Sequence, residues 1–240
     1  LHFSGAGSAY YVWVNGKEVG YNQGSRTPGE FDITDKLQAG SNSIAVEIYR
    51  YSDGSYLECQ DFWRLSGIFR DVFLVSEAKN GVYDFEVKTA LTNNYKTANV
   101  IVVAKGAMDS LTATLLDADN KEVATMSRCA AETATKGASK GQVYAVTVKN
   151  PKLWSAETPY LYKVLLTQKN GDVVGCNVGI RESKIFKGQL LVNGQPVLLK
   201  GVNRHEHDAK LGHVVTKEMM EKDVLLMKAA NINSVRTCHY

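Results

Sequence analysis

The sequence predicts a mainly β protein in three parts: a partial jelly-roll-like β-sandwich, an immunoglobulin-like β-sandwich, and the first, truncated strand–helix unit of a parallel (β/α)8 barrel. Apolar and polar residues alternate over most of the first 180 residues, with the two-residue period of half-buried strands. The one segment with a clear helical period lies near residue 220, between two apolar strands. With 240 residues the chain has room for two or more domains. We therefore divide it into residues 1–78, 79–181 and 182–240.

The first part, residues 1–78, begins with a strong hairpin signal. Two alternating segments, residues 10–14 and 17–21, flank Asn15-Gly16, and Asn-Gly is the turn that two-residue hairpins favour. Residues 31–33 and 43–49 continue the strand pattern. A loop at residues 52–67 interrupts it with charged and aromatic residues that strands seldom need. This pattern is typical of a β-sandwich or jelly roll.

The second part, residues 79–181, contains short alternating strands and no helical period. The strands are expected at residues 82–87, 98–104, 111–116, 144–148 and 160–167, with a last strand after the turn at 170–171. About a hundred residues of this pattern favour an immunoglobulin-like sandwich. Residues 130–140 are rich in Ala, Thr, Ser, Gly and Lys, which predicts an exposed, mobile loop.

The third part, residues 182–240, reads as a hairpin around Asn193-Gly194 followed by strand, helix and strand. Thr216 is the expected N-cap of the helix, and three apolar residues fall on one of its faces, namely Met220, Val224 and Met227. Strand, helix and strand in this order open a parallel α/β barrel. One such unit leaves strand edges unpaired, so we expect this part to pack poorly alone or to lean on the preceding sandwich.

Composition excludes some function classes and disfavours others. The net charge is only +3 and the 28 basic residues are scattered, so neither nucleic acid nor a membrane surface is an expected partner. The sequence contains no run of 18 apolar residues, so no membrane span is predicted. Four widely separated cysteines are typical of free thiols, which favours the cytoplasm and leaves the periplasm open. The chain begins at Leu1 and reads as a sequence already under way.

The three tryptophans could stack on sugars or fill the sandwich cores, and none is assigned a sugar-stacking role. Alternation with its strand neighbours predicts that Trp13 lies in the core of the first sandwich. Trp154 precedes a Ser-Ala-Glu-Thr-Pro segment and is expected to anchor a turn of the second sandwich. Trp63 fits either a sugar-stacking platform or a core position.

Ionisable groups gather at residues 203–208, at the end of a predicted barrel strand, where such barrels build their sites. The two-residue period puts His205 and His207 on one face. With His213 they could supply imidazoles to a metal, but no second ligand cluster follows. Solvated loop histidines are a second interpretation, which the residues alone favour over metal. Hydrogen bonding to a polyhydroxylated ligand is a third.

A resemblance to a known family favours the third interpretation. Residues 233–240, Asn-Ser-Val-Arg-Thr-Cys-His-Tyr, resemble the first signature of glycoside hydrolase family 2, and residues 201–207, Gly-Val-Asn-Arg-His-Glu-His, match the preceding strand in its β-galactosidase branch. Residues 52–58 and 60–72 are similar to the loop by which that family's sugar-binding domain reaches the active site. Residues 151–157 resemble its second domain. The order is right along nearly the whole chain, although residues 90–149 match in pattern only.

The resemblance implies a role for four residues. Asp61 would ligate a sodium ion and touch the galactose primary hydroxyl, since carboxylate oxygens suit both tasks. His205 and His239 would contact ring hydroxyls, because a neutral imidazole both donates and accepts. Arg236 would lie under the nucleophilic carboxylate and keep it ionised. The plainer alternatives are a loop-capping Asp, histidines satisfied by backbone, and a structural salt bridge.

The resemblance also implies an internal fragment of a large, multidomain bacterial-type β-galactosidase, homo-oligomeric and acting on galactosides. Retaining hydrolysis needs two carboxyl groups about 5–5.5 Å apart, and the family places both, with its magnesium ligands, on barrel strands beyond this sequence. Strand alternation turns Glu206 away from the side of His205, so it is no substitute. The 240 residues alone are therefore expected to hold a partial sodium site, no catalytic residue and no activity.

Two other functions remain open. A β-glucuronidase of the same family resembles this sequence, but its counterpart of residues 205–207 reads His-Glu-Asp where this chain has His-Glu-His. Two tandem sandwiches could also form a non-catalytic carbohydrate-binding or adhesion array, because fold alone does not fix function. The barrel-like segment after residue 182 argues against such an array, which has no need of it.

Overall fold

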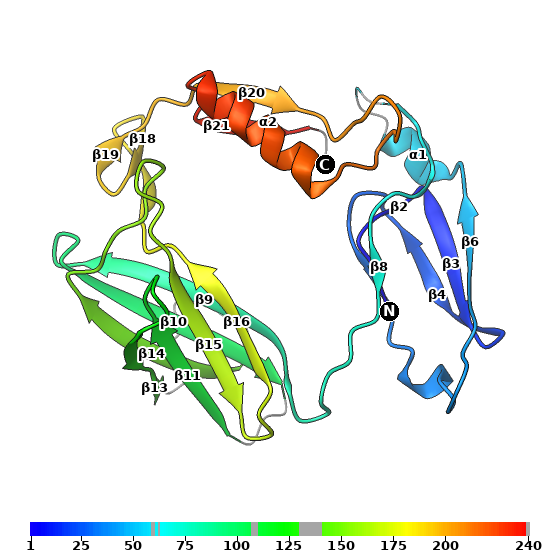
Figure 1. Cartoon of the computed structure of the whole chain (residues 1–240), viewed down its shortest axis with the longest axis horizontal. Helices are drawn as coiled ribbons and strands as arrows, with labels where there is room; N and C mark the ends of the chain where they lie inside the picture. Colours follow the sequence, from blue (N-terminus) through cyan, green and yellow to red (C-terminus); the bar gives the residue numbers. More distant parts are fainter. Residues whose placement is uncertain (59–60, 62, 107–109, 130–140, 239–240) are drawn as a thin grey trace. The chain divides into compact units, whose positions relative to one another are not determined.

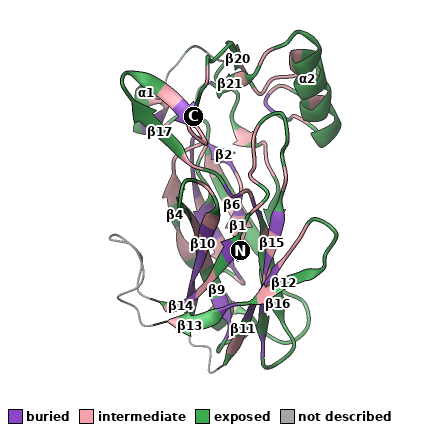
Figure 2. Ribbon diagram, turned by 90° about the vertical axis from the view of Figure 1, so that its left-hand side faces the viewer, coloured by how far each residue is buried: buried purple, intermediate pink, exposed green. Residues whose placement is uncertain are grey.

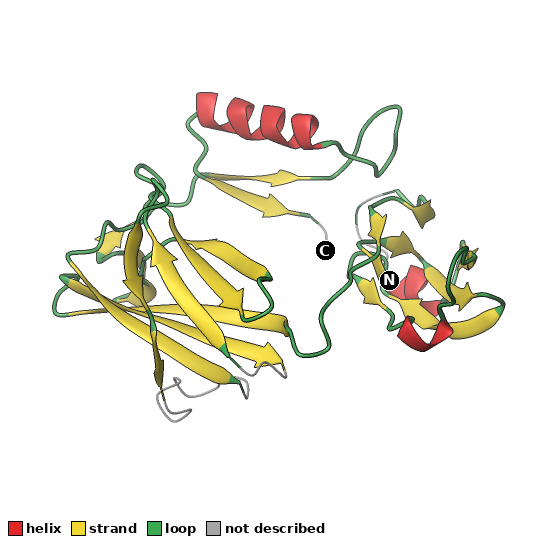
Figure 3. Ribbon diagram, turned by 60° about the horizontal axis from the view of Figure 1, so that its bottom comes forward, coloured by secondary structure: helices red, strands yellow, loops and turns green. Residues whose placement is uncertain are grey.

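A computed structural model describes residues 1–58, 61, 63–106, 110–129 and 141–238. These residues form two compact units, one of residues 1–76 and 199–240 and the other of residues 77–198 (Figure 1). Strands dominate both units, and the longer helix belongs to the first (Figure 3). The predicted fold class, a partial jelly-roll-like sandwich, an immunoglobulin-like sandwich and a first barrel unit, is confirmed.

The first unit contains a small sandwich built around the predicted hairpin. Asn15 and Gly16 have φ angles of 51° and 75°, the left-handed conformation that a two-residue turn of this type requires. One sheet has the strand order β4-β3-β6 and another has the order β5-β1-β8. Phe3, Tyr10 and Val12 form the buried core between them. The strands are β1 (His2–Phe3), β3 (Ala9–Val14), β4 (Lys17–Gln23), β5 (Gly29–Glu30), β6 (Ile44–Tyr49) and β8 (Val72–Phe73), with β2 (Ala6–Gly7) paired to β7 (Gly67–Ile68).

Three details of this sandwich differ from the sequence prediction. Trp13 is only half-buried, because Val12 and Val14 on the same strand fill the core and turn Trp13 to the opposite face beside Tyr11. Residues 31–33 are not a strand but lead into a short 3-10 helix, η1 (Thr34–Lys36). Asp32 accepts a hydrogen bond from the Thr34 N–H at 3.0 Å, which favours a turn over extended chain.

The third detail is a short helix, α1 (Asp53–Leu57), within the segment predicted as loop. Ser52 is its N-cap residue, and the Ser52 N–H donates to the Ser55 Oγ at 3.0 Å. Gln23 on β4 donates to the Asp53 carboxylate at 2.7 Å and so attaches this helix to the sheet. This hydrogen bond fixes α1, which precedes Asp61 in the sequence, on the sandwich.

The second unit is a sandwich of two four-stranded antiparallel sheets with the orders β13-β14-β10-β9 and β12-β11-β15-β16. Its core joins the sheets through fully buried residues such as Val102, Leu115 and Leu166, and β10 and β15 are mostly buried (Figure 2). The strands are β9 (Val82–Thr92), β10 (Thr97–Gly106), β11 (Leu111–Leu116), β12 (Glu122–Thr125), β13 (Ser127–Cys129), β14 (Gln142–Lys149), β15 (Tyr162–Gln168) and β16 (Val173–Val178). The predicted mobile loop at 130–140 lies outside the described residues.

A small antiparallel sheet closes the second unit, formed by β17 (Ser183–Phe186), β18 (Gln189–Val192) and β19 (Gln195–Pro196). Asn193 and Gly194 adopt the left-handed conformation predicted for their turn. Trp154 makes an isolated bridge with Pro159, and its N–H donates to the Ile180 carbonyl at 2.9 Å. The prediction that Trp154 anchors a turn is thus confirmed.

The barrel-like part consists of β20 (Gly201–Arg204), α2 (Lys217–Ala229) and β21 (Ser234–Thr237). The two strands pair in parallel, as the strand–helix–strand pattern predicts. No residue of α2 is buried, and Val224 on the predicted apolar face is 51% exposed. This part groups with residues 1–76 rather than with the second sandwich. None of the helices in the described part of the chain is long and apolar enough to cross a membrane.

Helix α2 buries no residue, so we expect its N-cap to contribute measurably to its stability. The Thr216 side chain accepts a hydrogen bond from the Met219 N–H at 3.3 Å. Replacing it in Thr216→Ala should cost about 1 kcal/mol of helix stability. We expect faster amide hydrogen exchange along α2 and unchanged exchange in β10 and β15. Thr216→Ser, which keeps the hydroxyl, should exchange as wild type. Equal exchange in all three proteins would show that the cap carries no stability.

Candidate functional site

Parallel pairing of β20 and β21 places the candidate barrel residues at one edge. Asn203 lies opposite Arg236, and the Cys238 N–H donates to the Arg204 carbonyl at 3.1 Å just beyond the strands. His205 follows β20 directly and is exposed. The exposed Arg236 approaches the Asn203 Oδ1 at 3.5 Å. The carboxyl ends of parallel barrel strands form the face where such folds carry their sites.

A tight turn follows this edge. Asp208 Oδ1 accepts hydrogen bonds from the N–H groups of Leu211 and Lys210, both at 2.8 Å. These two bonds, with Leu211 the larger cause, lower the pKa of the Asp208 carboxyl from its usual value. The backbones of Asp208 and Gly212 are bridged, so the turn is closed at both ends. It presents the buried His213 back toward the segment at 205–207.

The loop that contains Asp61 and residues 63–66, here called the Asp61 loop, lies against this edge within the first unit. The Trp63 and His207 rings meet edge to face, with centroids 4.0 Å apart. The Trp63 carbonyl accepts a hydrogen bond from His213 Nε2 at 2.7 Å. Asp61, which is exposed, lies two residues before Trp63, and His205 lies two residues before His207. The structure therefore brings together the two segments that hold Asp61 and His205.

The fourth candidate, His239, lies outside the described residues. The described backbone ends at Cys238, whose side chain is 1% exposed, immediately after β21. The role of His239 stays a prediction, as do those of Asp61, His205 and Arg236.

Four charged side chains form an ion-pair network that the sequence does not predict. Glu206 pairs with Arg70 at 2.9 Å between Oε2 and Nη2, and approaches Arg204 at 4.0 Å. Arg204 pairs in turn with Asp223 of α2 at 2.8 Å. The Arg70, Glu206 and Arg204 side chains are between 14% and 29% exposed. The network thus connects helix α2, the end of β20 and the loop before β8.

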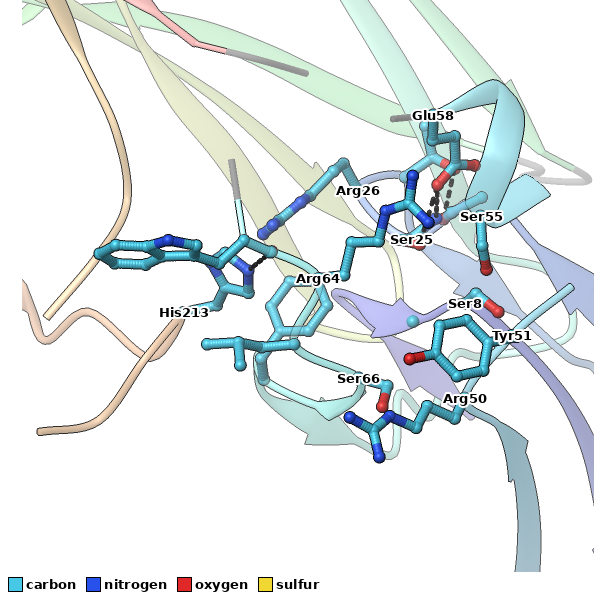
Figure 4. A pocket seen from close by; sticks show the side chains of 16 residues that line it. Ser8, Ser25, Arg26, Arg50, Tyr51, Ser55, Glu58, Arg64, Ser66 and His213 are labelled. Atoms are coloured by element: carbon cyan, nitrogen blue, oxygen red, sulfur yellow. Dashed lines mark hydrogen bonds between the residues drawn. The ribbon is translucent and has the colours of Figure 1, made fainter. Parts of the chain in front are cut away.

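A cavity of about 220 Å³ opens beside the loop that contains Trp63 (Figure 4). Ser25 donates to Glu58 at 2.9 Å on one side of it, and His213 closes another side. Its charged and aromatic lining includes Arg26, Arg50, Glu58, Arg64, Phe69 and His213. Among the described candidate residues, Asp61, His205 and Arg236 do not line the cavity, whereas Trp63 and His213 do.

The histidines do not form the metal centre that one interpretation considered. Both ring nitrogens of His213 face carbonyl oxygens, Nε2 toward Trp63 and Nδ1 toward Glu206 at 3.4 Å. Among the residues that the structure describes, no group of three His, Cys, Asp or Glu side chains is placed to hold a metal ion. A single exposed carboxylate such as Asp61 can still supply one oxygen to a hard cation.

Family models match the chain in three consecutive segments. Residues 1–78 match the sugar binding domain of glycosyl hydrolases family 2. Residues 80–181 match a second model, described as glycosyl hydrolases family 2, and residues 183–240 match the family's TIM barrel domain.

Curated relatives and solved structures agree with this assignment. A β-galactosidase of Priestia megaterium is 45% identical over 100% of this chain, and one of Pseudoalteromonas haloplanktis is 42% identical over 99%. The chain spans 24% of the length of each. The structure of a Ruminococcus gnavus β-glucuronidase superposes on 100% of the chain with a TM-score of 0.85 and 26% identity, which covers 42% of that protein. An uncultured Clostridium sp. β-glucuronidase gives a TM-score of 0.84 at 25% identity, over 100% of this chain and 41% of that one.

Three matching domain models in the order of the family, together with relatives of this similarity, show that the chain belongs to glycoside hydrolase family 2.

Proposed function

We propose that this chain is the galactose-binding portion of a longer retaining β-galactosidase, which hydrolyses terminal non-reducing β-D-galactose residues. The observation that carries the proposal is the packing of the Asp61 loop against the end of β20, through Trp63, His207 and His213. This packing joins the segments that carry Asp61 and His205, which supports recognition of a polyhydroxylated sugar by oxygen and imidazole groups from both. The names of the two curated relatives support the substrate.

In this proposal each candidate residue has a separate task. Asp61 accepts a hydrogen bond from the primary hydroxyl of galactose and gives one oxygen ligand to a sodium ion. His205 and His239 bind ring hydroxyls. The Arg236 guanidinium stabilises the ionised form of the nucleophilic carboxylate, which residues outside this chain supply. Magnesium, when bound, is held by residues of the longer protein and supplies a fixed positive charge near the site.

A specific observation keeps β-glucuronidase as the second candidate, since solved structures that superpose on the whole chain carry that name. Two arguments favour galactose. The relatives named β-galactosidase are 42–45% identical, whereas the β-glucuronidases are 25–26% identical. Moreover, a glucuronide carries a carboxylate where galactose carries its primary hydroxyl, and a second negative charge beside Asp61 is unfavourable.

The two candidates are separated by substrate preference. The longer protein that contains this chain should hydrolyse an aryl β-D-galactoside with a kcat/KM well above that for the matching aryl β-D-glucuronide. Product stereochemistry, followed by proton NMR, should show retention at the anomeric carbon. A preference for the glucuronide would exclude galactose as the natural sugar, and inversion would exclude the retaining mechanism.

The 240-residue chain alone should not hydrolyse an aryl galactoside. Retaining hydrolysis needs an acid–base carboxyl and a nucleophilic carboxyl, and this proposal assigns both to other parts of the longer protein. The measurement is release of the aryl alcohol by purified chain over hours, with Asp61→Ala as the control for a contaminating hydrolase. Hydrolysis by the wild-type chain that Asp61→Ala abolishes would refute the prediction.

A further inference from the structure

The contacts between the Asp61 loop and the barrel segment join parts of the chain that lie far apart in sequence. Arg70 and Glu206 are separated by 136 residues, and Trp63 and His213 by 150. In Figure 4 the dashed line at His213 marks the second of these contacts. Neither contact involves Asp61 or His205 directly. The contacting residues can therefore affect the site only by positioning the segments that carry Asp61 and His205.

On the side of the sandwich, the Arg70–Glu206 pair is anchored by further contacts of Arg70. Arg70 Nη2 binds the Glu206 carboxylate, while Nη1 lies 3.3 Å from the Arg26 carbonyl and 3.5 Å from the Ser4 carbonyl. The guanidinium plane is therefore fixed by two parts of the sandwich before it meets Glu206. Because both side chains are less than a third exposed, loss of either charge leaves the other poorly solvated.

His213 makes the second connection. It is only 7% exposed, and its Nε2 lies 2.7 Å from the Trp63 carbonyl oxygen. A carbonyl oxygen only accepts, so Nε2 carries the hydrogen of this bond. The backbone bridge between Asp208 and Gly212 closes the turn immediately before His213 and so restricts its backbone. Trp63 is thus bound at its carbonyl by His213 and at its ring by His207.

We propose that Glu206, Arg70 and His213 are positioning residues that hold the Asp61 loop against the end of β20. The inference rests on the proposed function, and it adds residues that the motifs do not assign to the site. Glu206 lies between His205 and His207, so its bond to Arg70 fixes the backbone from which both imidazoles extend. His213 fixes the loop two residues beyond Asp61. Together they set the separation of the two groups that grip the sugar.

The kinetic test uses the longer protein with an aryl β-D-galactoside. Glu206→Gln and His213→Leu should each raise KM about tenfold and leave kcat within about twofold, because a displaced binding group weakens substrate and transition state alike. His213→Gln, whose amide can donate to the Trp63 carbonyl, should restore part of the loss. Glu86→Gln, which breaks the Glu86–Lys88 pair in the second unit, is the matched control and should leave KM unchanged.

A structural measurement on the 240-residue chain distinguishes position from folding. Glu206→Gln should speed amide exchange at residues 63–70 and 201–213, with β10 and β15 unchanged. Raised KM together with faster exchange in these two segments supports the proposal. An unchanged KM overturns the proposal. A fall in kcat as large as the rise in KM across all variants also overturns it. If the wild-type longer protein fails to hydrolyse galactosides, the proposed function fails, and the exchange result still decides whether these residues couple the two segments.

Discussion

Leu166→Ala in β15 should lower the free energy of unfolding of the second unit by about 2–5 kcal/mol. Leu166 is 0% exposed and lies in the core that joins the two sheets. Its strand neighbours in register are Ala113 and Val174, which are too small to fill the space it would leave. Strands β11 and β16 hold β15 from both sides, so collapse onto the cavity is limited.

Native-state amide exchange is the appropriate measurement, because two compact units need not unfold in one transition. The slowest amides of β10 and β15 should lose protection by the full amount, while those of β3 and β4 keep theirs. Leu198→Ala makes the same chemical change at a site that is 76% exposed, and should cost less than about 0.5 kcal/mol. A loss below 1 kcal/mol for Leu166→Ala would mean that this core is loosely packed.

The strands of the second unit could be predicted closely because two signals agree there. Alternation gives the strand interior, and turn residues give its ends, so the predicted strand at 111–116 coincides with β11 (Leu111–Leu116). The first sandwich was harder. Alternation divides β3 into two faces but does not say which is buried, and the face of Val12 and Val14 filled the core in place of Trp13.

The candidate site likewise contains some contacts that the sequence predicts and others that it does not. The strand–helix–strand pattern predicted the parallel pairing that sets Asn203 beside Arg236, since that pairing follows from local periods. It could not predict that Glu206 meets Arg70 or that His213 meets Trp63. These contacts depend on how two distant segments dock, and a single Glu or His carries no sign of its partner. From the sequence, Glu206 stands out only as a possible replacement acid.

Asp61→Ala in the longer protein should lower kcat/KM for an aryl β-D-galactoside by about 10- to 100-fold. A hydrogen bond to a charged group contributes about 1.5–3 kcal/mol, and this carboxylate is proposed to make one to the sugar's primary hydroxyl. Asp61→Asn keeps an acceptor but loses the charge, so it should lie between wild type and Asp61→Ala. Asp35→Asn, at an exposed carboxylate paired with Lys36, is the control and should match wild type.

The sodium dependence of the same variants tests the second task of this carboxylate. Replacing sodium by choline at constant ionic strength should raise KM of the wild-type protein, because the ion is proposed to bind Asp61 and to orient the sugar. Asp61→Ala should lose most of this response, since an Ala side chain offers no oxygen to a hard cation. An aryl β-D-fucoside, which lacks the primary hydroxyl of the galactoside, should lose less kcat/KM in Asp61→Ala than the galactoside does. If Asp61→Ala impairs the fucoside as strongly as the galactoside, the carboxylate does not act on that hydroxyl.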